Sequence, residues 1–395
     1  MIKVLRIINR FNLGGPTYNA AYLSKYLPEE FETLLVGGEI DESEAGSHYI
    51  LDELGLKPIV IPEMRRAINI IDDVKAYNKI KEIILEFKPD IVHTHASKAG
   101  TLGRLAAASC GVPVILHTFH GHVFHSYFNK LKTSIFKKIE RSLSKKSTCI
   151  IAISDKQKEE LGIEHNIAAI DKIKVIPLGF NLSKFQDNIQ EKRKRFRSDY
   201  NVAEDEIAIG IIGRLVPVKN HNFFLDAIKT VSGKTTKKIK VFIVGDGEDK
   251  RGLLDKAGQL DIPFCVSGFT ENTKLLSFTS WIKEIDYVNA GLDIVALSSL
   301  NEGTPVSLIE AQAANNPIIS TNVGGIENIV IEGETALLSE VGDVQTYAKN
   351  LLCLLEDDEL RVRMAKKGWE HVREKFSTER LAKDVAKLYR ELLRK

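Results

Sequence analysis

The sequence lacks the features that mark several protein classes. Its 4 cysteines are scattered over 395 residues with no CxxC pair, so we expect neither a structural zinc site nor a disulfide framework. No uninterrupted apolar run of about 18 residues occurs, so we expect no membrane-spanning helix. The first residues, Met1–Ile8, are interrupted by charges and predict a strand rather than a signal peptide. A net charge of +2 gives no reason to expect nucleic acid as a partner.

The length and the pattern of the chain predict more than one α/β domain. A chain of 395 residues exceeds one ordinary core, and 44% hydrophobic with 27% charged residues is typical of a soluble globular protein. The scattered cysteines fit a reducing cytoplasm. Short apolar strands alternate with helical patterns, which predicts doubly wound parallel sheets. The strands expected in the first half are Val4–Ile8, Thr33–Val36, Pro58–Ile61, Ile91–His93, Val114–His117, Ile150–Ile153 and Val175–Ile176. Those expected in the second half are Ile207–Ile212, Lys240–Val244, Leu276–Phe278, Ile294–Leu297, Pro317–Ser320 and Ala336–Leu338.

The segment Asn301–Glu310 is the most informative part of the chain. It follows an apolar run that predicts a buried strand, and it carries Glu302 in a turn and Glu310 in the helix that follows. Thr304 is expected as the helix N-cap and Pro305 as the first helical residue. Helix N-termini attract phosphate, and carboxylates accept hydrogen bonds from sugar hydroxyls. The pattern therefore predicts a site for a sugar joined to a phosphate; the alternative is two surface glutamates on an ordinary αβ unit.

This strand-turn-helix resembles the E-x7-E motif of family 4 glycosyltransferases, which are retaining enzymes of the GT-B fold. The resemblance covers nearly the whole chain and is most specific over residues 207–335. It implies two Rossmann-like domains that face each other across a cleft. We expect an acceptor-binding domain at 1–185, a nucleotide-sugar-binding domain at 186–376, and a C-terminal helix at 377–395 that crosses back to the first domain.

The loop after the strand Ile207–Ile212 resembles the family pattern G-R-L…K-G, with Gly213, Arg214, Leu215 and Lys219 matching. Asn220 stands where the family usually has glycine. A diphosphate that departs gains negative charge, and paired cations stabilise it. The resemblance thus implies that Arg214 and Lys219 hold the diphosphate. Without the resemblance, Arg214 and Lys219 would be interpreted as solvated surface charges.

Two further elements of this half resemble the family's nucleotide pocket. Gly245 lies in a turn like the V-G-x-G motif, and Trp281 lies in an element like F-x-G-W, although Ser280 replaces the usual glycine. By resemblance Glu310 binds the ribose hydroxyls and Glu302 binds hydroxyls of the donor sugar. The same resemblance places backbone groups at the start of the helix beside the diphosphate, in a segment made of Gly303, Thr304, Pro305 and Val306.

Glycines and histidines mark the acceptor half. Gly14 and Gly15 follow the first strand, but G-x-G-x-x-G is absent, so no dinucleotide role follows. In the family such glycines let the first loop approach the donor phosphate and the acceptor. The T-x-H element of the family matches Thr118-Phe119-His120, which implies that His120 hydrogen-bonds the donor sugar. A zinc site on His117, His120, His122 and His125 is an alternative, but the interval from His93 to His125 offers no carboxylate to orient the imidazoles.

Residues 122–146 form a basic amphipathic segment with seven Lys or Arg and one Glu. Such a segment either lies on an anionic membrane surface or packs its apolar side inward and hydrates its lysines. The first option suits a peripheral enzyme at the inner face of the cell membrane, because family members of bacterial type often use lipid-linked acceptors.

Taken together, the resemblance implies a retaining glycosyltransferase of cell-surface polysaccharide synthesis. It would move a sugar from a nucleotide-diphosphate sugar, with UDP the expected nucleotide, to a glycan or polyprenyl-linked acceptor. No metal is required, because Arg214, Lys219 and the helix end would replace a metal cation. The alternatives are a GT-B nucleotide-sugar epimerase and a non-catalytic nucleotide-sugar-binding protein.

Overall fold

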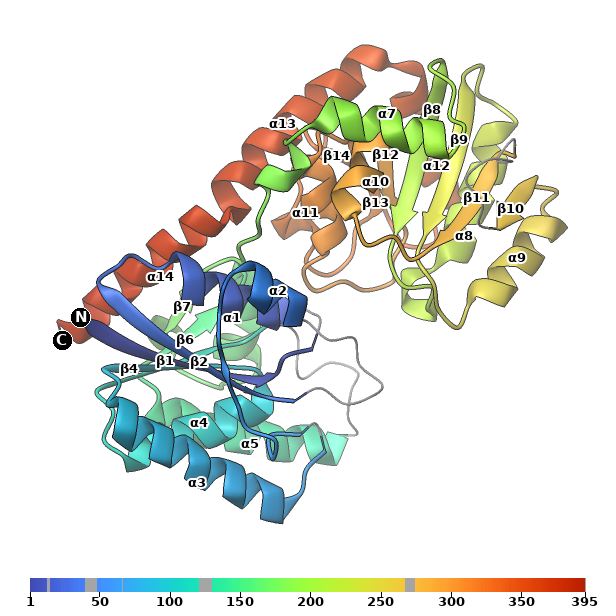
Figure 1. Ribbon diagram of the computed structural model, residues 1–395. Coiled ribbons are helices and arrows are strands. Elements are labelled where there is room, and N and C mark those ends of the chain that lie inside the picture. Colours follow the sequence, from blue (N-terminus) through green and yellow to red (C-terminus); the bar gives the residue numbers. More distant parts are fainter. Residues whose placement is uncertain (13–14, 40–47, 66, 121–129, 267–273, 395) are drawn as a thin grey trace. The chain divides into compact units, whose positions relative to one another are not determined.

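The computed structural model describes the chain except residues 13–14, 40–47, 66, 121–129, 267–273 and 395 (Figure 1). It divides into two compact units. The first unit contains Met1–Phe180 together with Lys375–Lys395, and the second contains Asn181–Glu374. The chain therefore leaves the first unit slightly before the expected boundary at 185/186, and its C-terminal segment belongs to the first unit.

The first unit is built on a seven-stranded parallel sheet with the order β3-β2-β1-β4-β5-β6-β7. The strands are β1 (Ile2–Arg10), β2 (Phe31–Gly38), β3 (Ile59–Val60), β4 (Ile91–His95), β5 (Val114–Thr118), β6 (Cys149–Ala152) and β7 (Ile173–Val175). Strands of parallel sheets are covered on both faces and are therefore almost uniformly apolar. The continuous runs of the sequence follow this rule.

Successive residues of β1 point to opposite faces of this sheet, so they pack against different helices. Val4 lies in a cluster with residues of α1 (Gly15–Tyr26) and α14 (Thr378–Leu393), such as Leu381 and Tyr389. Leu5 lies in a second cluster with residues of α3 (Ile70–Phe87) and α4 (Ser97–Ser109). Figure 1 shows α14 beside α1 on one face and α3 and α4 on the other. The other helices of the unit are α2 (His48–Glu53), α5 (Lys130–Lys146) and α6 (Asp155–Glu159).

The second unit repeats this architecture with a seven-stranded parallel sheet of order β10-β11-β9-β8-β12-β13-β14. Its strands are β8 (Glu206–Ile212), β9 (Lys238–Val244), β10 (Phe264–Val266), β11 (Leu276–Ser280), β12 (Ile294–Leu297), β13 (Ile318–Thr321) and β14 (Ala336–Ser339). Its helices are α7 (Ile189–Asp199), α8 (His221–Ser232), α9 (Lys250–Gln259), α10 (Ile285–Gly291), α11 (Val306–Ala313), α12 (Val344–Glu356) and α13 (Asp358–Phe376). The α/β fold class with two parallel sheets is confirmed.

The two faces of the second sheet are covered in different ways. On one face, α8, α9 and α12 bury an aliphatic cluster that includes Ile209, Ile228 and Leu351. On the other face, α7 and α10 contribute Phe196 and Tyr287, whose ring centroids are 5.2 Å apart and which pack with Phe242 and Tyr200. Edge-to-face ring contacts of this kind fix the orientation of the two helices on the sheet.

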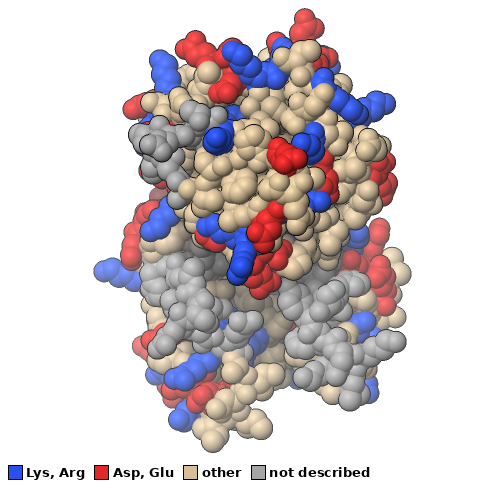
Figure 2. Space-filling model, turned by 90° about the vertical axis from the view of Figure 1, so that its right-hand side faces the viewer, with Lys and Arg blue, Asp and Glu red and all other residues tan. Residues whose placement is uncertain are grey.

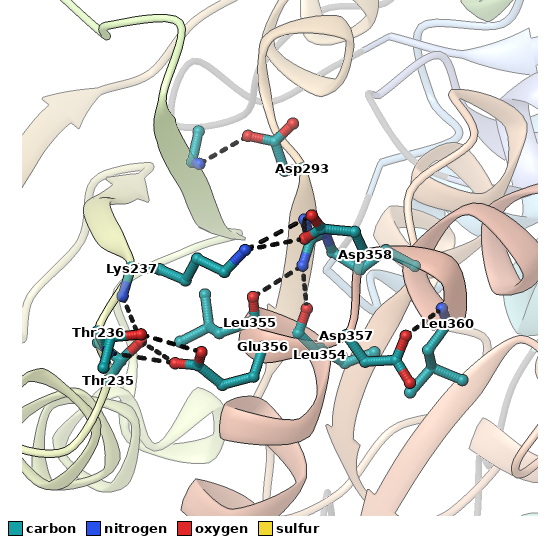
Figure 3. A network of polar contacts seen from close by, with 12 residues as sticks. Thr235, Thr236, Lys237, Asp293, Leu354, Leu355, Glu356, Asp357, Asp358 and Leu360 are labelled. Carbon is teal, nitrogen blue, oxygen red and sulfur yellow. Dashed lines mark hydrogen bonds and ion pairs between the residues drawn. The ribbon is translucent and has the colours of Figure 1, made fainter.

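Polar contacts fasten the α12–α13 turn to the loop between α8 and β9 (Figure 3). The Thr235 hydroxyl donates to the Glu356 carboxylate over 2.6 Å, and the Lys237 ammonium contacts Asp358 at 3.3 Å. The Asp357 carboxylate accepts from the backbone N–H of Leu360 at 2.8 Å and so caps the start of α13. These contacts hold the helix junction on the side of the sheet that α8 and α12 cover.

The surface carries charges of both signs, and the described helices lack membrane-spanning character. On the face shown in Figure 2, Lys and Arg side chains are interspersed with Asp and Glu, in keeping with the small net charge. Among the described helices, none has the length and the apolar character needed to cross a membrane.

Candidate active site

Each sheet has a point where the chain reverses its direction of strand addition, and α/β proteins bind ligands at that point outside the carboxyl ends of the strands. In the second unit this point lies between β8 and β12, which are hydrogen-bonded neighbours. The loop Gly213–Asn220 follows β8, and the loop Ser298–Pro305 follows β12. The sheet order therefore brings the two main candidate segments together.

An ion pair joins these two loops. The Lys219 ammonium lies 2.5 Å from Oε1 of Glu302, and the Ser299 hydroxyl donates to the same oxygen over 2.6 Å. The Ser298 hydroxyl donates to the Lys219 carbonyl at 2.9 Å. Two residues expected to take part in catalysis are thus in direct contact and partly buried, and two serines that the sequence did not single out hold them in place.

Arg214 occupies the same loop but lies exposed, with no partner among the described residues. The turn at Gly213 packs directly on the turn at Gly245, where an added Cβ would lie 1.9 Å from the Gly213 carbonyl oxygen. Gly245 has φ +148°, a conformation that favours glycine. These two glycines therefore allow the ends of β8 and β9 to meet, and Arg214 extends from that junction.

The turn at Gly324 and Gly325, after β13, packs against the backbone of Glu302. An added Cβ at Gly324 or Gly325 would lie 1.9 Å from the Glu302 carbonyl oxygen or 1.8 Å from that of Gly303, respectively. The Gly325 N–H donates to the Glu302 carbonyl over 2.9 Å. The turn after β13 thus packs on the Glu302 loop and fixes its path.

The helix that carries Glu310 starts one residue later than expected. Pro305 has φ −72° and ψ 93°, so it is the N-cap and α11 begins at Val306; the expectation that Thr304 caps the helix is wrong. Pro305 has no N–H to donate. The free donors at the start of the helix are therefore those of Val306 and Ser307, which have no acceptor within the helix.

Glu310 differs from Glu302 in its surroundings. Burial raises the pKa of its carboxyl to about 7; the nearby Asp286 carboxylate adds to this rise and Lys184 opposes it. No described residue donates a hydrogen bond to this carboxylate. Glu310 thus offers an unoccupied acceptor about one helical turn after the free N–H groups at the start of α11.

The candidate base-binding element is rigid where the family glycine is replaced. Ser280 has φ +60°, and its hydroxyl donates to the Asp246 carboxylate over 2.7 Å. The Lys250 ammonium contacts the same carboxylate at 2.9 Å, and these contacts lower the pKa of Asp246 to about 2. The hydrogen bond offsets the cost of a left-handed serine. The neighbouring Trp281 remains 56% exposed, so its ring is accessible.

In the first unit, the candidate residues lie at the ends of β1 and β5. Gly15 begins α1, while Gly14 lies outside the described residues. His120 follows β5, and its Nε2 lies 2.9 Å from Nδ1 of His95. Burial lowers the pKa of His120 to about 3, so the ring is neutral at physiological pH.

The histidines proposed for zinc do not all fall within the described chain. His117 instead has its Nδ1 2.8 Å from the Thr94 hydroxyl, and His122 and His125 lie outside the described residues. Within the described ranges, no group of three or more His, Cys, Asp or Glu side chains is arranged to hold a metal ion.

A buried polar cluster around Arg6 and His95 was not expected to take part in the site. Arg6 is fully buried, and it lies within hydrogen-bonding distance of both His93 and His95. The sequence signal was present, because Arg6 interrupts the otherwise apolar run of a strand that is buried on both faces. A charge at such a position is costly and therefore calls for a specific partner.

Comparison with known proteins identifies the family of this chain. The family model "Glycosyltransferase Family 4" matches residues 13–184, and the model "Glycosyl transferases group 1" matches residues 192–371. A galactosyltransferase of Escherichia coli, named UDP-Gal:alpha-D-GlcNAc-diphosphoundecaprenol alpha-1,3-galactosyltransferase, is 30% identical over 335 residues, which cover 85% of this chain and 82% of that protein. The chain belongs to the family 4 glycosyltransferases.

Other relatives of this glycosyltransferase are of the same kind. The capsular polysaccharide biosynthesis glycosyltransferase CapM of Staphylococcus aureus is 27% identical, with 85% of each chain covered. Among solved structures, Anabaena HepE in complex with UDP aligns over 99% of this chain and 100% of its own, with a TM-score of 0.79 at 17% identity. A glycosyltransferase from Rickettsia africae aligns over 99% and 98% of the two chains with a TM-score of 0.80 at 20% identity. These structures support the GT-B fold.

Proposed function

We propose that this glycosyltransferase transfers a sugar from a UDP-sugar to a lipid-linked or glycan acceptor with retention of anomeric configuration. The observation that carries the proposal is the Lys219–Glu302 pair, held at the point where β8 and β12 meet and followed by the free N-terminus of α11. A cation, a carboxylate and unpaired N–H groups match the needs of a diphosphate joined to a sugar.

The chemistry asks little of the protein beyond positioning and charge. The acceptor hydroxyl attacks the anomeric carbon on the face that the diphosphate leaves, the bond from that carbon to the diphosphate oxygen breaks, and the departing oxygen takes the acceptor's proton. Lys219, Arg214 and the N–H groups of Val306 and Ser307 stabilise the charge that grows on the diphosphate. Glu302 and His120 hold hydroxyls of the donor sugar, and Glu310 holds the ribose.

The other nucleotide contacts follow the same scheme. Gly14, Gly15, Gly213 and Gly245 leave room for close approach of the backbone to the donor. Gly303, Thr304 and Pro305 shape the turn that leads into α11. Trp281 lies beside the nucleobase. Because these cationic and N–H groups carry the charge, we expect no metal requirement.

The choice of UDP and of a lipid-linked acceptor rests on names of relatives. The Escherichia coli relative is named for UDP-galactose and a diphosphoundecaprenol acceptor, and CapM is named for capsular polysaccharide synthesis. The Anabaena structure, which shares only the fold, was solved with UDP. We therefore place the reaction in cell-surface polysaccharide synthesis at the cytoplasmic face of the membrane.

The test is a product assay with defined substrates. The protein is incubated with UDP-galactose, UDP-glucose, UDP-N-acetylglucosamine or GDP-mannose and a short-chain GlcNAc-diphosphoprenol, with and without EDTA. We expect UDP release that requires the acceptor, survives EDTA and yields an α-glycoside by NMR. A β-glycoside would overturn retention, and consumption of UDP-N-acetylglucosamine without acceptor would point to an epimerase. No binding of any nucleotide would overturn the enzymatic proposal.

We also propose that α5 docks the enzyme on an anionic membrane. Two isoleucines spaced one turn apart on this helix are exposed, Ile135 by 50% and Ile139 by 40%, and exposed lysines including Lys138 and Lys145 flank them. A helix that packs all of its apolar residues inward would hide these two. Apolar residues beside lysines favour the boundary between headgroups and acyl chains.

This proposal is tested by sedimentation with phosphatidylglycerol vesicles. Replacing Ile135 and Ile139 with serine, or Lys138 and Lys145 with glutamate, should release the protein from the vesicles. Ile163→Ser is the matched control, because Ile163 is 67% exposed outside α5 and should not change binding. Binding that survives both double substitutions would rule out α5 as the docking element.

A further inference from the structure

A buried cation without an anionic partner lies at the centre of the first sheet. Arg6 on β1 is 0% exposed, and its Nη1 lies 3.1 Å from Nδ1 of His93 and 3.4 Å from Nε2 of His95. Its Nε and Nη2 have no partner among the described residues. An arginine buried among neutral groups is expensive, so its retention calls for a role beyond packing.

The role follows from the fact that a guanidinium only donates hydrogen bonds. The ring nitrogens that face Arg6 must therefore be acceptors. A neutral imidazole carries one N–H, so the proton of His95 resides on Nδ1. That N–H faces Nε2 of His120 at 2.9 Å and donates to it.

The same reasoning fixes the second branch of the cluster. Nδ1 of His93 faces both Arg6 and the Tyr389 hydroxyl, which lies 2.6 Å away on α14. His93 therefore carries its proton on Nε2 and donates to the Thr118 hydroxyl over 2.7 Å. The rings of His93 and His95 stack with centroids 4.4 Å apart, so both branches are held by one packed cluster.

The protonation state of His120 is the outcome of this chain of donors. Since Nε2 of His120 accepts from His95, its own proton lies on Nδ1. Burial lowers the pKa values of His93, His95 and His120, so all three rings are neutral at physiological pH. Nδ1 of His120 is buried and has no partner among the described residues, and an unmet buried donor costs free energy until an acceptor arrives.

We infer that Arg6 and His95 are positioning residues, which fix His120 as the Nδ1–H tautomer so that this N–H donates to a hydroxyl oxygen of the donor sugar. The inference rests on the proposed role of His120 in the transferase reaction. It explains why a permanent cation is buried in the middle of a largely apolar strand. A neutral amide at that position could donate or accept and would leave the tautomer of His95 open.

The direct test is the tautomer of His120 in the full-length protein, measured by two-bond nitrogen–proton NMR correlations of ¹⁵N-histidine-labelled samples. We expect Nδ1 of His120 to be protonated and Nε2 unprotonated. His95→Asn keeps a donor near the position of Nδ1 and should preserve this pattern. His95→Asp supplies only acceptors and should move the proton of His120 to Nε2. Arg6→Gln should give a mixture of tautomers.

Kinetics provide the functional readout. Arg6→Gln and His95→Asp should lower kcat by about 10- to 100-fold, the range expected for loss of one directed hydrogen bond in the reaction, while UDP affinity stays within about twofold. His95→Asn should restore most of the rate. Thr94→Val is the matched control, because it removes a buried bond to His117 and leaves the donors between Arg6 and His120 intact. It should lower thermal stability without a change in the His120 tautomer.

The outcomes separate this inference from the proposed function. Protonation of Nε2 in the unmodified protein would overturn the inference and leave the transferase proposal standing. A correct tautomer in a protein that binds no nucleotide would overturn the transferase proposal instead. Equal rate losses in His95→Asn and His95→Asp would show that His95 acts through packing rather than through its proton.

Discussion

The contact between Lys219 and Glu302 raises the question of whether the lysine is still available to a phosphate. An ammonium has three donors, and Glu302 occupies one of them. The remaining two can serve a diphosphate, and the fixed position lowers the cost of ordering a flexible side chain at the moment of reaction. The ion pair therefore presents the lysine rather than removing it from the site.

Loss of either cation should slow chemistry far more than it weakens the fold. Lys219→Ala and Arg214→Ala should each lower kcat on the order of 10²–10³-fold, because in the proposed mechanism each group stabilises charge that grows in the transition state. Steady-state UDP release with the preferred donor measures the effect. Lys229→Ala on the exposed side of α8 is the control and should keep full activity. Normal turnover in both site variants would remove these residues from the mechanism.

Glu310 should make donor binding depend on pH near neutrality. Its pKa of about 7 means that the carboxylate, which we propose accepts hydrogen bonds from the ribose hydroxyls, forms as pH rises from 6 to 8. Affinity for a UDP-sugar should therefore increase over this interval, and Glu310→Gln should abolish the dependence. Calorimetric titration at several pH values measures it. A UDP-sugar is a better probe than UDP, whose terminal phosphate titrates with a pKa near 6.

Glu310 should also make the free energy of unfolding depend on pH, but this free energy decreases as pH rises whereas donor affinity increases. The folded pKa lies above the ordinary carboxyl value of 4.5, so between about pH 4.5 and 7 the folded state binds a proton that the unfolded state has lost. The contribution of Glu310 to the free energy of unfolding is present below pH 4.5 and is lost as pH rises through 7. Without ligand, Glu310→Gln should lose less stability than the unmodified protein over this window.

At the scale of elements, the site is assembled from turns whose backbones touch. The turns after β8 and β9 meet at Gly213 and Gly245, and the turns after β12 and β13 meet at Glu302 and Gly325. These contacts leave no space for a methyl group. The position of Glu302 therefore depends on Gly325, which has no proposed contact with a substrate.

Gly325→Ala should therefore displace the turn that carries Glu302. Its Cβ would lie 1.8 Å from the Gly303 carbonyl oxygen, so the Glu302 turn must shift. We expect a loss of about 1–3 kcal/mol in stability and a lower kcat. Gly252→Ala on exposed α9 is the control, since an added Cβ there meets nothing within 4 Å. It should raise stability by up to about 1 kcal/mol and leave activity unchanged.

The fold was predictable from the sequence because its strands are short, nearly continuous apolar runs between helical patterns. The expected strand Ile294–Leu297 matches the structure at both ends. The edge strand β10 was missed, because three residues with partly exposed side chains carry little periodic signal. The cap at Thr304 was wrong, because the φ of proline suits a helix but the ψ of Pro305 is extended.

The contacts between the candidate site residues were less predictable from the sequence than the residues themselves. Lys219 and Glu302 are 83 positions apart, and their contact depends on β8 and β12 being neighbours, which local patterns do not reveal. The left-handed conformation of Ser280 is accompanied by a hydrogen bond to Asp246, which lies in the turn after β9 and 34 positions away in the sequence. The Arg6 cluster likewise joins β1, β4 and α14, so it exists only once the first unit is folded.

At the scale of the molecule, the first unit combines Met1–Phe180 with the distant segment Lys375–Lys395. Residues of α14, including Leu381 and Tyr389, lie in one core cluster with β1 and β4, although Tyr389 and His93 are 296 positions apart. The Ser377 hydroxyl caps this helix by accepting from the Arg380 N–H. Because α14 belongs to the core of the first unit, that unit should respond as a whole to a defect in this helix.

Paired core substitutions test this independence of the units. Leu381→Ala, at a position that is 2% exposed, should cost about 2–5 kcal/mol and raise hydrogen exchange in peptides of Met1–Phe180. Leu354→Ala, at 0% exposure in the second core, should do the same within Asn181–Glu374 only. UDP affinity should therefore fall more with Leu354→Ala, because most of the groups proposed to bind the nucleotide, such as Lys219 and Glu310, lie in that unit. Equal exchange in both units for either variant would show a single cooperative fold and would contradict this division.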